Sequence, residues 1–159
     1  NGSRAWTVLA ENDTVRAGDS LDVSALRIAY RTDLPFVLLA ASDKNARVAA
    51  RGRERVAGRD VDRIEVVNGT DPWRMLYVDL ATRRLVAFDQ RERGPRGYYL
   101  ARRVYGDYRE LDGIQWPYRE ERFVSNHPLM TLEITGVQLN PELNETFFSP
   151  PKGAVTPWR

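Results

Sequence analysis

The chain has no cysteine among its 159 residues and only one histidine, His127. The absence of cysteine excludes disulfides, thiolate nucleophiles and cysteine-based zinc sites. A single histidine cannot form a His-based metal site, and we interpret His127, within Ser-Asn-His-Pro, as a turn residue. No serine lies in a nucleophile-elbow glycine pattern. We therefore expect no catalytic residues, no bound metal and no cofactor.

Long hydrophobic runs are also absent. The longest apolar stretch, Leu34 to Ala41, is too short to cross a bilayer, so we expect no transmembrane segment. The first residues do not resemble a signal peptide, so for an exported protein we expect that this peptide has been removed or that the sequence starts after it.

The chain also lacks a large excess of either charge, because its formal net charge is only +2. The segment from Gly94 to Tyr105 mixes arginines with aromatic residues, a composition typical of single-stranded nucleic-acid surfaces. The near-balanced charge and the neighbouring acids Glu92 and Asp107 favour an unspecific basic edge strand instead. We expect no nucleic-acid partner.

What the sequence does contain is the period-two alternation of β-strands. Apolar residues make up 42% and charged residues 29%, which is typical of a globular protein. Turn signals such as Asn68-Gly69 and Asp112-Gly113 separate the strands. Strands are expected at 4–9, 48–56, 61–67, 73–80, 85–90, 98–109, 114–125 and 129–139, helical pieces at 19–30 and 34–41, and a loop at 11–18.

This spacing favours a meandering antiparallel sheet over parallel α/β units. The expected fold class is mainly β (α+β): an open antiparallel β-barrel or strongly curved sheet, with a helical insert covering the concave face. Residues 1–159 are expected to form a single domain.

Acidic residues gather in the hairpin around Asp112-Gly113. A pair of carboxylates could act as acid and base, as in glycosidases. On a half-buried hairpin, however, such charges usually face water and pair with arginines across the strands. The carboxylates are Asp107, Glu110, Asp112, Glu120 and Glu121, and their expected partners are Arg109, Arg119 and Arg122.

Two expected strands are apolar on both faces, Trp73 to Val78 and Leu129 to Leu132. Either a helix covers the second face, or a concave apolar surface receives a hydrophobic ligand, and the two can coexist. Alternation alone selects the lining, and a one-residue slip would invert it. The expected lipid-binding residues are Val66, Leu76, Val78, Tyr99, Ile114, Trp116, Leu132 and Ile134.

The chain resembles the bacterial lipoprotein-carrier superfamily, the periplasmic and outer-membrane lipoprotein-sorting proteins. The best-matching segment runs from Asp107 to Pro117 and is followed by Asn140-Pro-Glu-Leu and by Phe147-Phe148. Weaker matches occur in the same order at 1–6, up to Leu39, 53–59, 61–67 and 75–79, with Thr82 at the next turn.

The resemblance implies an open antiparallel barrel with helices at its mouth that binds acyl chains without catalysis. It also implies that the family's N-terminal helix and first strands are missing from residues 1–159. We therefore expect a non-enzymatic protein of the bacterial periplasm or envelope that binds a lipid or lipoprotein acyl chain, with a role in lipoprotein sorting or transport. The alternative is an accessory interaction domain of a larger envelope protein, such as one that is associated with a protease.

Overall fold

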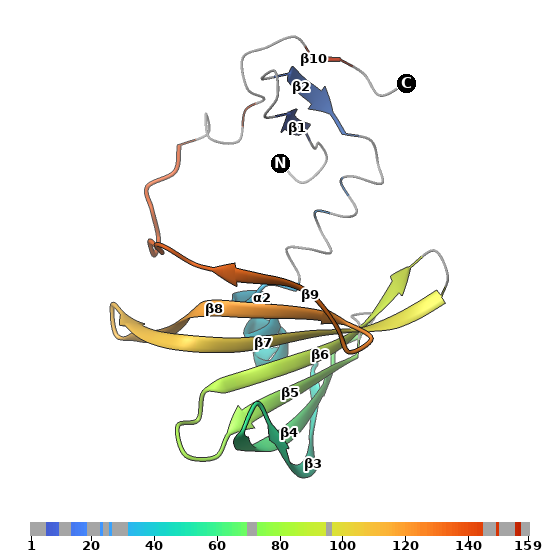
Figure 1. The fold of residues 1–159 in the computed structure, drawn as a ribbon, viewed down its shortest axis with the longest axis vertical. Coiled ribbons are helices and arrows are strands. Elements are labelled where there is room, and N and C mark those ends of the chain that lie inside the picture. Colours follow the sequence, from blue (N-terminus) through green and yellow to red (C-terminus); the bar gives the residue numbers. More distant parts are fainter. Residues whose placement is uncertain are drawn as a thin grey trace. The chain divides into compact units, whose positions relative to one another are not determined.

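The computed structural model describes residues 6–9, 14–18, 23, 26, 32–69, 73–94, 97–144, 149 and 155–156. The chain divides into two compact units, residues 39–139 and residues 1–38 together with 140–159. The larger unit is a sheet of seven strands in sequential order from β3 to β9 (Figure 1). This confirms the predicted fold class in the form of an open, mostly β structure, because the sheet does not close into a barrel.

Every neighbouring pair in the larger sheet is antiparallel. The last strand ends at Glu133, so its predicted extension to residue 139 is wrong. The arginine-rich strand after Gly94 lies between two others, so its predicted edge position is also wrong. The strands are β3 (Arg47–Val56), β4 (Arg59–Val67), β5 (Arg74–Asp79), β6 (Leu85–Gly94), β7 (Gly97–Leu111), β8 (Ile114–Val124) and β9 (His127–Glu133).

Two-residue turns with positive φ at both positions join three of the hairpins. Such turns match the right-handed twist of the flanking strands. Asp112-Gly113 forms one of them as the sequence predicts, and His127 follows another as the first residue of β9. The three turns are Ala57-Gly58, Asp112-Gly113 and Ser125-Asn126.

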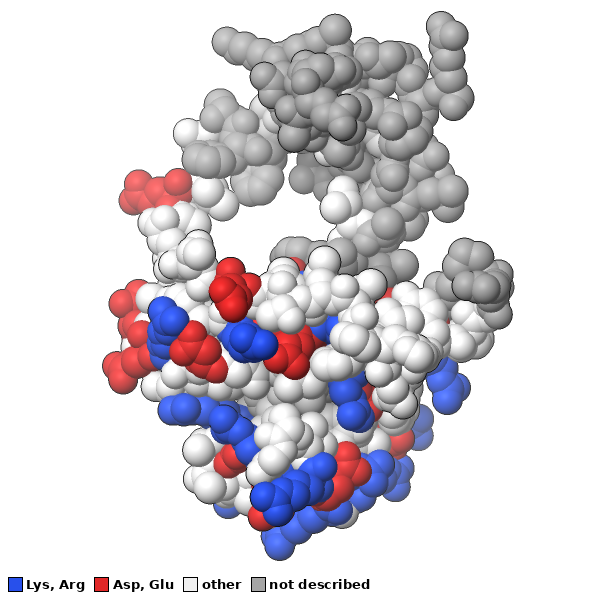
Figure 2. All heavy atoms as spheres, in the orientation of Figure 1, with Lys and Arg blue, Asp and Glu red and all other residues white. Residues whose placement is uncertain are grey.

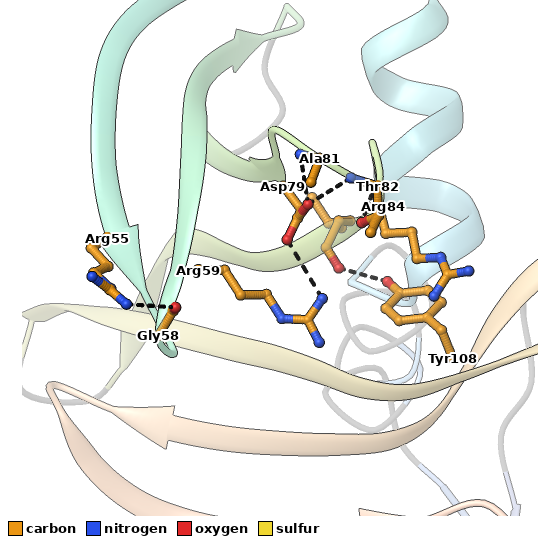
Figure 3. A network of polar contacts seen from close by, with 9 residues as sticks. Arg55, Gly58, Arg59, Asp79, Ala81, Thr82, Arg84 and Tyr108 are labelled. Atoms are coloured by element: carbon orange, nitrogen blue, oxygen red, sulfur yellow. Dashed lines mark hydrogen bonds and ion pairs between the residues drawn. The ribbon is translucent and has the colours of Figure 1, made fainter.

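The connection between β5 and β6 is organised by Asp79 (Figure 3). Its Oδ1 accepts hydrogen bonds from the backbone N–H groups of Ala81 at 2.9 Å and Thr82 at 2.7 Å. Its Oδ2 lies 3.5 Å from Nη1 of Arg59, on β4. The pKa of Asp79 is lowered, mainly by the N–H group of Thr82. One ionised carboxylate therefore ties this turn to the neighbouring strand.

The central strands β5 and β6 are buried on both faces, unlike the half-wet strands of a simple antiparallel sheet. On one face the hydrophobic cluster comprises Val56, Val61, Met75, Tyr77, Val86 and Ala87, with Trp73 and Val104 packed against it. By contrast Leu129 and Met130 on β9 are 64% and 48% exposed. Of the two segments predicted to be apolar on both faces, only the first is buried.

The smaller unit contains a three-stranded sheet. Strand β1 (Trp6–Leu9) pairs antiparallel with β2 (Thr14–Ala17), which pairs parallel with β10 (Val155–Thr156). The predicted loop over 11–18 is therefore wrong where β2 forms, and Val15 of this strand is only 1% exposed. Within the predicted helix at 19–30, Val23 and Leu26 are helical, and the rest lies outside the described residues.

Helix α2 (Leu34–Ser42) forms where the second helical piece is predicted. Asp33 accepts hydrogen bonds at its carbonyl oxygen from the N–H groups of Phe36 and Val37. The helix spans the boundary between the two units, so its predicted place over a concave face stays a prediction. No helix within the described part of the chain is long and apolar enough to span a membrane.

Candidate functional site

Strand β8 defines the face of the sheet on which the candidate site lies. Its register with β7 is regular along its length, so every second side chain points to the same face. We call this the Trp116 face and the opposite one the Tyr77 face. The side chains of β8 on the Trp116 face belong to Ile114, Trp116, Tyr118, Glu120 and Arg122.

The strand registers place all eight predicted lipid-binding residues on the Trp116 face. Val66 pairs across the strands with Arg74, Arg74 pairs with Gln90, Gln90 with Ala101, and Ala101 with Val124 of β8. Val124 has the same parity as Trp116, so this whole row, including Val66, lies on the Trp116 face. Leu76 and Val78 alternate with Arg74 along β5. Tyr99 lies two residues before Ala101 on β7, Leu132 lies opposite Glu120, and the N–H group of Ile134 donates to the carbonyl oxygen of Tyr118.

Burial divides these eight residues into two groups. Val66 and Leu76 are 1% and 4% exposed, so they are core residues here. Ile114 is 51% exposed, and Trp116 is half-buried beside it on β8. Leu132 and Ile134 are also half-buried. Val78 on β5 and Tyr99 on β7 are half-buried as well. The most exposed residue of the predicted lining is therefore Ile114 on β8, and the role of the lining in binding lipid stays a prediction.

A surface pocket of about 490 Å³ adjoins this accessible group. Arg109 stacks 4.4 Å from the ring centre of Tyr118 and forms a 2.6 Å ion pair with Asp107. Arg119 pairs with Glu121 at 2.8 Å. The pocket combines an aromatic wall with paired charges, and its lining is Asp107, Arg109, Tyr118, Arg119, Glu133, Ile134 and Thr135.

A charged cluster separates the two apolar groups of the Trp116 face, and the sequence predicted the participation of Glu120 and Arg122 but not that of Arg103. Nη1 of Arg103 lies 3.3 Å, and Nε of Arg122 lies 2.6 Å, from the same Oε1 atom of Glu120. Tyr105 lies directly opposite Glu120 and is 5% exposed. Alternation along each strand places even-numbered residues of β8 and odd-numbered residues of β7 on this face. Only the cross-strand register shows that Arg103 of β7 lies close to Glu120 and Arg122 of β8. The face is therefore amphipathic rather than uniformly oily.

The Tyr77 face carries a second polar group, which is buried beside the hydrophobic cluster. Arg102 contacts both carboxylate oxygens of Asp89, at 2.7 Å and 2.8 Å, and Tyr77 donates to the same carboxylate. Burial and the neighbouring Asp89 raise the pKa of Tyr77 to about 12. All three side chains are satisfied by one another, which is typical of a structural network.

The carboxylates of the β7–β8 hairpin pair with the expected arginines along the strands, whereas Glu120 also pairs across the strands, with Arg103 of β7. Asp107 with Arg109 and Glu121 with Arg119 are each two residues apart. Arg109 lowers the pKa of Asp107, which stays ionised near neutral pH. Within the described ranges, no group of three or more acidic or histidine residues is placed to hold a metal ion. That the protein is not an enzyme stays a prediction.

Opposite charges are interleaved over the sheet. Figure 2 shows arginine and acidic side chains side by side across the visible face of the larger unit. On β7 the arginines of the basic-aromatic segment are engaged, since Arg102 pairs with Asp89 and Arg103 with Glu120. Carboxylates thus offset the charge of these two arginines, and the absence of a nucleic-acid partner stays a prediction.

Comparison with known proteins gives one similarity in fold. No protein-family model matches the chain, and no curated protein sequence matches it. Among solved structures, the chain is similar to the crystal structure of a proposed outer membrane lipoprotein-sorting protein domain from Vibrio parahaemolyticus. The two share 14% identity with a TM-score of 0.44, over 86% of this chain and 62% of that domain, so the chain spans less than two thirds of its length.

Proposed function

We propose that this protein is a non-enzymatic component of the bacterial cell envelope that binds an acyl chain of a lipid or lipoprotein on the Trp116 face. Its role would then be in lipoprotein sorting or transport. The observation that carries the proposal is the accessible apolar strip of Ile114, Trp116, Leu132 and Ile134 next to the pocket.

The driving force is the burial of hydrocarbon, about 0.8 kcal/mol for each CH₂ group removed from water. An amphipathic site suits such a ligand, because the chain requires apolar contacts and the head requires polar ones. Trp116 and Tyr118 suit this role, since large aromatic side chains give much contact area for few rotatable bonds.

The test uses the purified protein of residues 1–159. Organic extraction followed by mass spectrometry identifies any lipid that co-purifies, and titration with a fluorescent long-chain fatty acid measures affinity. We expect saturable binding and a change in tryptophan fluorescence. Absence of both co-purifying lipid and fatty-acid binding would overturn the proposal.

A matched pair of variants locates the site. Ile114→Asp places a charge in the accessible strip and should weaken binding by at least tenfold. Val48→Asp makes the same kind of change on β3, at a residue of similar exposure (54% against 51%), and should leave binding unchanged. Both residues are exposed, so neither variant is expected to unfold the protein. Equal effects of the two variants would place the ligand elsewhere.

The exposed apolar residues of β9 favour a second candidate, an accessory interaction domain of a larger envelope protein. Leu129 is 64% and Met130 48% exposed, on a strand at the end of the larger sheet. A photo-crosslinker in place of Met130 should capture one envelope protein, and Leu129→Asp should abolish that product. Crosslinking that is unaffected by Leu129→Asp would refute this candidate.

A further inference from the structure

The charged cluster on the Trp116 face contains two guanidinium groups and one carboxylate. Arg103 and Arg122 lie directly opposite one another across β7 and β8, an arrangement that is destabilising for like charges. Both contact Oε1 of Glu120, whose carboxylate attracts the two guanidinium groups. Arg122 makes this contact with Nε, and within the described part of the chain its two Nη nitrogens donate no hydrogen bond. The side of Arg122 that carries these nitrogens can therefore accept an anion.

Tyr105 provides an independent observation at the same place. Its ring stacks on Phe88 at 6.2 Å between centres, and its hydroxyl is buried without a hydrogen-bond partner among the described residues. Leaving a buried hydroxyl without a partner is unfavourable, so such groups are rare unless something binds them. Tyr105 lies directly opposite Glu120, and burial together with the charge of Glu120 raises the pKa of Tyr105. At neutral pH the hydroxyl keeps its proton and can donate it in a hydrogen bond.

The cluster has a partial opening to solvent. The side chain of Arg122 is 30% exposed, against 13% for Glu120 and 11% for Arg103. Beyond Glu120 on the same face of β8 come Tyr118 and Trp116, and Leu132 lies opposite Glu120 on β9. An anionic group at Arg122 would therefore lie at one end of the accessible apolar strip.

We propose that Arg122 and the hydroxyl of Tyr105 form the headgroup subsite for an anionic amphiphile, whose acyl chain lies along Tyr118, Trp116 and Leu132. This inference rests on the proposed function, which it makes more specific. The shared chemistry is a singly or doubly charged oxyanion, either the carboxylate of a fatty acid or the phosphate of a lysophospholipid. Arg122 supplies the charge and N–H donors, and Tyr105 supplies one O–H donor.

The test compares three ligands with one chain length: a fatty acid, the corresponding fatty alcohol and the corresponding lysophosphatidic acid. We expect the native protein to bind at least one of the two anionic ligands about tenfold or more tightly than the alcohol, since a hydrogen bond to a charged group contributes about 1.5 to 3 kcal/mol. The anion that binds more tightly identifies the source of the headgroup. Equal affinity for all three ligands would overturn the subsite and leave the proposed function intact, whereas binding of none would overturn both.

Two variants test the named atoms. Tyr105→Phe removes only the hydroxyl, and because that oxygen has no described partner, the free energy of unfolding should be unchanged or higher. Arg122→Gln removes the guanidinium. Each variant should bring the affinity for the anionic ligand close to that for the alcohol, whereas Arg53→Gln, on β3, should not. A preference for the anion that survives both variants would refute the assignment, as would a loss of stability in Tyr105→Phe.

Discussion

The hydroxyl of Tyr77 donates a 2.6 Å hydrogen bond to Oδ2 of Asp89, and the two residues are 4% and 3% exposed. This contact links β5 to β6 diagonally on the Tyr77 face, where Arg102 of β7 completes the network. Hydrogen bonds between polar side chains thus connect three adjacent strands, next to the hydrophobic cluster to which Tyr77 belongs. The network on the Tyr77 face therefore stabilises the sheet, and the ligand site that we propose lies on the opposite, Trp116 face.

Tyr77→Phe should lower the free energy of unfolding by about 1.5 to 3 kcal/mol, because it removes a buried hydrogen bond to a charged acceptor. Urea denaturation followed by circular dichroism measures the change. Tyr98→Phe is the matched control, because Tyr98 is 72% exposed. Equal stability of the Tyr77 variant and the native protein would show that the contact makes no net contribution.

Stability should fall at alkaline pH. The folded pKa of Tyr77 is raised from 10.0 to about 12, so its contribution is fully present below pH 10 and is lost as the pH rises through about 12. Tyr99 and Tyr108 have pKa values raised to about 12 as well and act in the same direction. Denaturation at a series of pH values should show a smaller alkaline decline in Tyr77→Phe. An identical decline in both proteins would exclude Tyr77 as a contributor.

Asp79 should make the free energy of unfolding fall at acid pH. Its folded pKa is lowered below the ordinary value of 3.8, so its contribution is present above that pH and is lost as the pH falls through the lower, folded value. Asp79→Ala removes the acceptor for the N–H groups of Ala81 and Thr82 and should destabilise the protein near neutral pH. Thermal melts from neutral to acid pH test this. A variant whose acid dependence equals that of the native protein would contradict it.

Val61→Ala should destabilise the protein by about 1 to 3 kcal/mol, because Val61 is fully buried in the hydrophobic cluster and the change leaves a cavity. Val48→Ala removes the same two carbons from a side chain that is 54% exposed, and its effect should be much smaller. Denaturant midpoints of the two variants give the comparison. Similar losses in both would mean that the cluster is not the core of the sheet.

Local features of the sequence were sufficient to predict most elements of the larger sheet. Asp112-Gly113 adopts positive φ at both positions, as a two-residue hairpin turn requires, and this sets the register of β7 with β8. Pro35 lies in the first turn of α2, where proline is favoured. The short strand β2 was missed, since Thr14 to Ala17 is too short to show alternation and pairs with Val155-Thr156, far along the chain.

The alternation of residues along each strand determined which side chains share a face, because the side-chain period of a β-strand is two. Tertiary structure alone decided which parts of that face are open. Val66 and Leu76 are buried while Ile114 is exposed, although all three fit the same pattern. Strand pairing likewise brought Arg103, Glu120 and Arg122 together, because contacts between β7 and β8 depend on the register and not on either strand alone. Burial and cross-strand contact are properties of the packed sheet, and a single strand's sequence does not specify them.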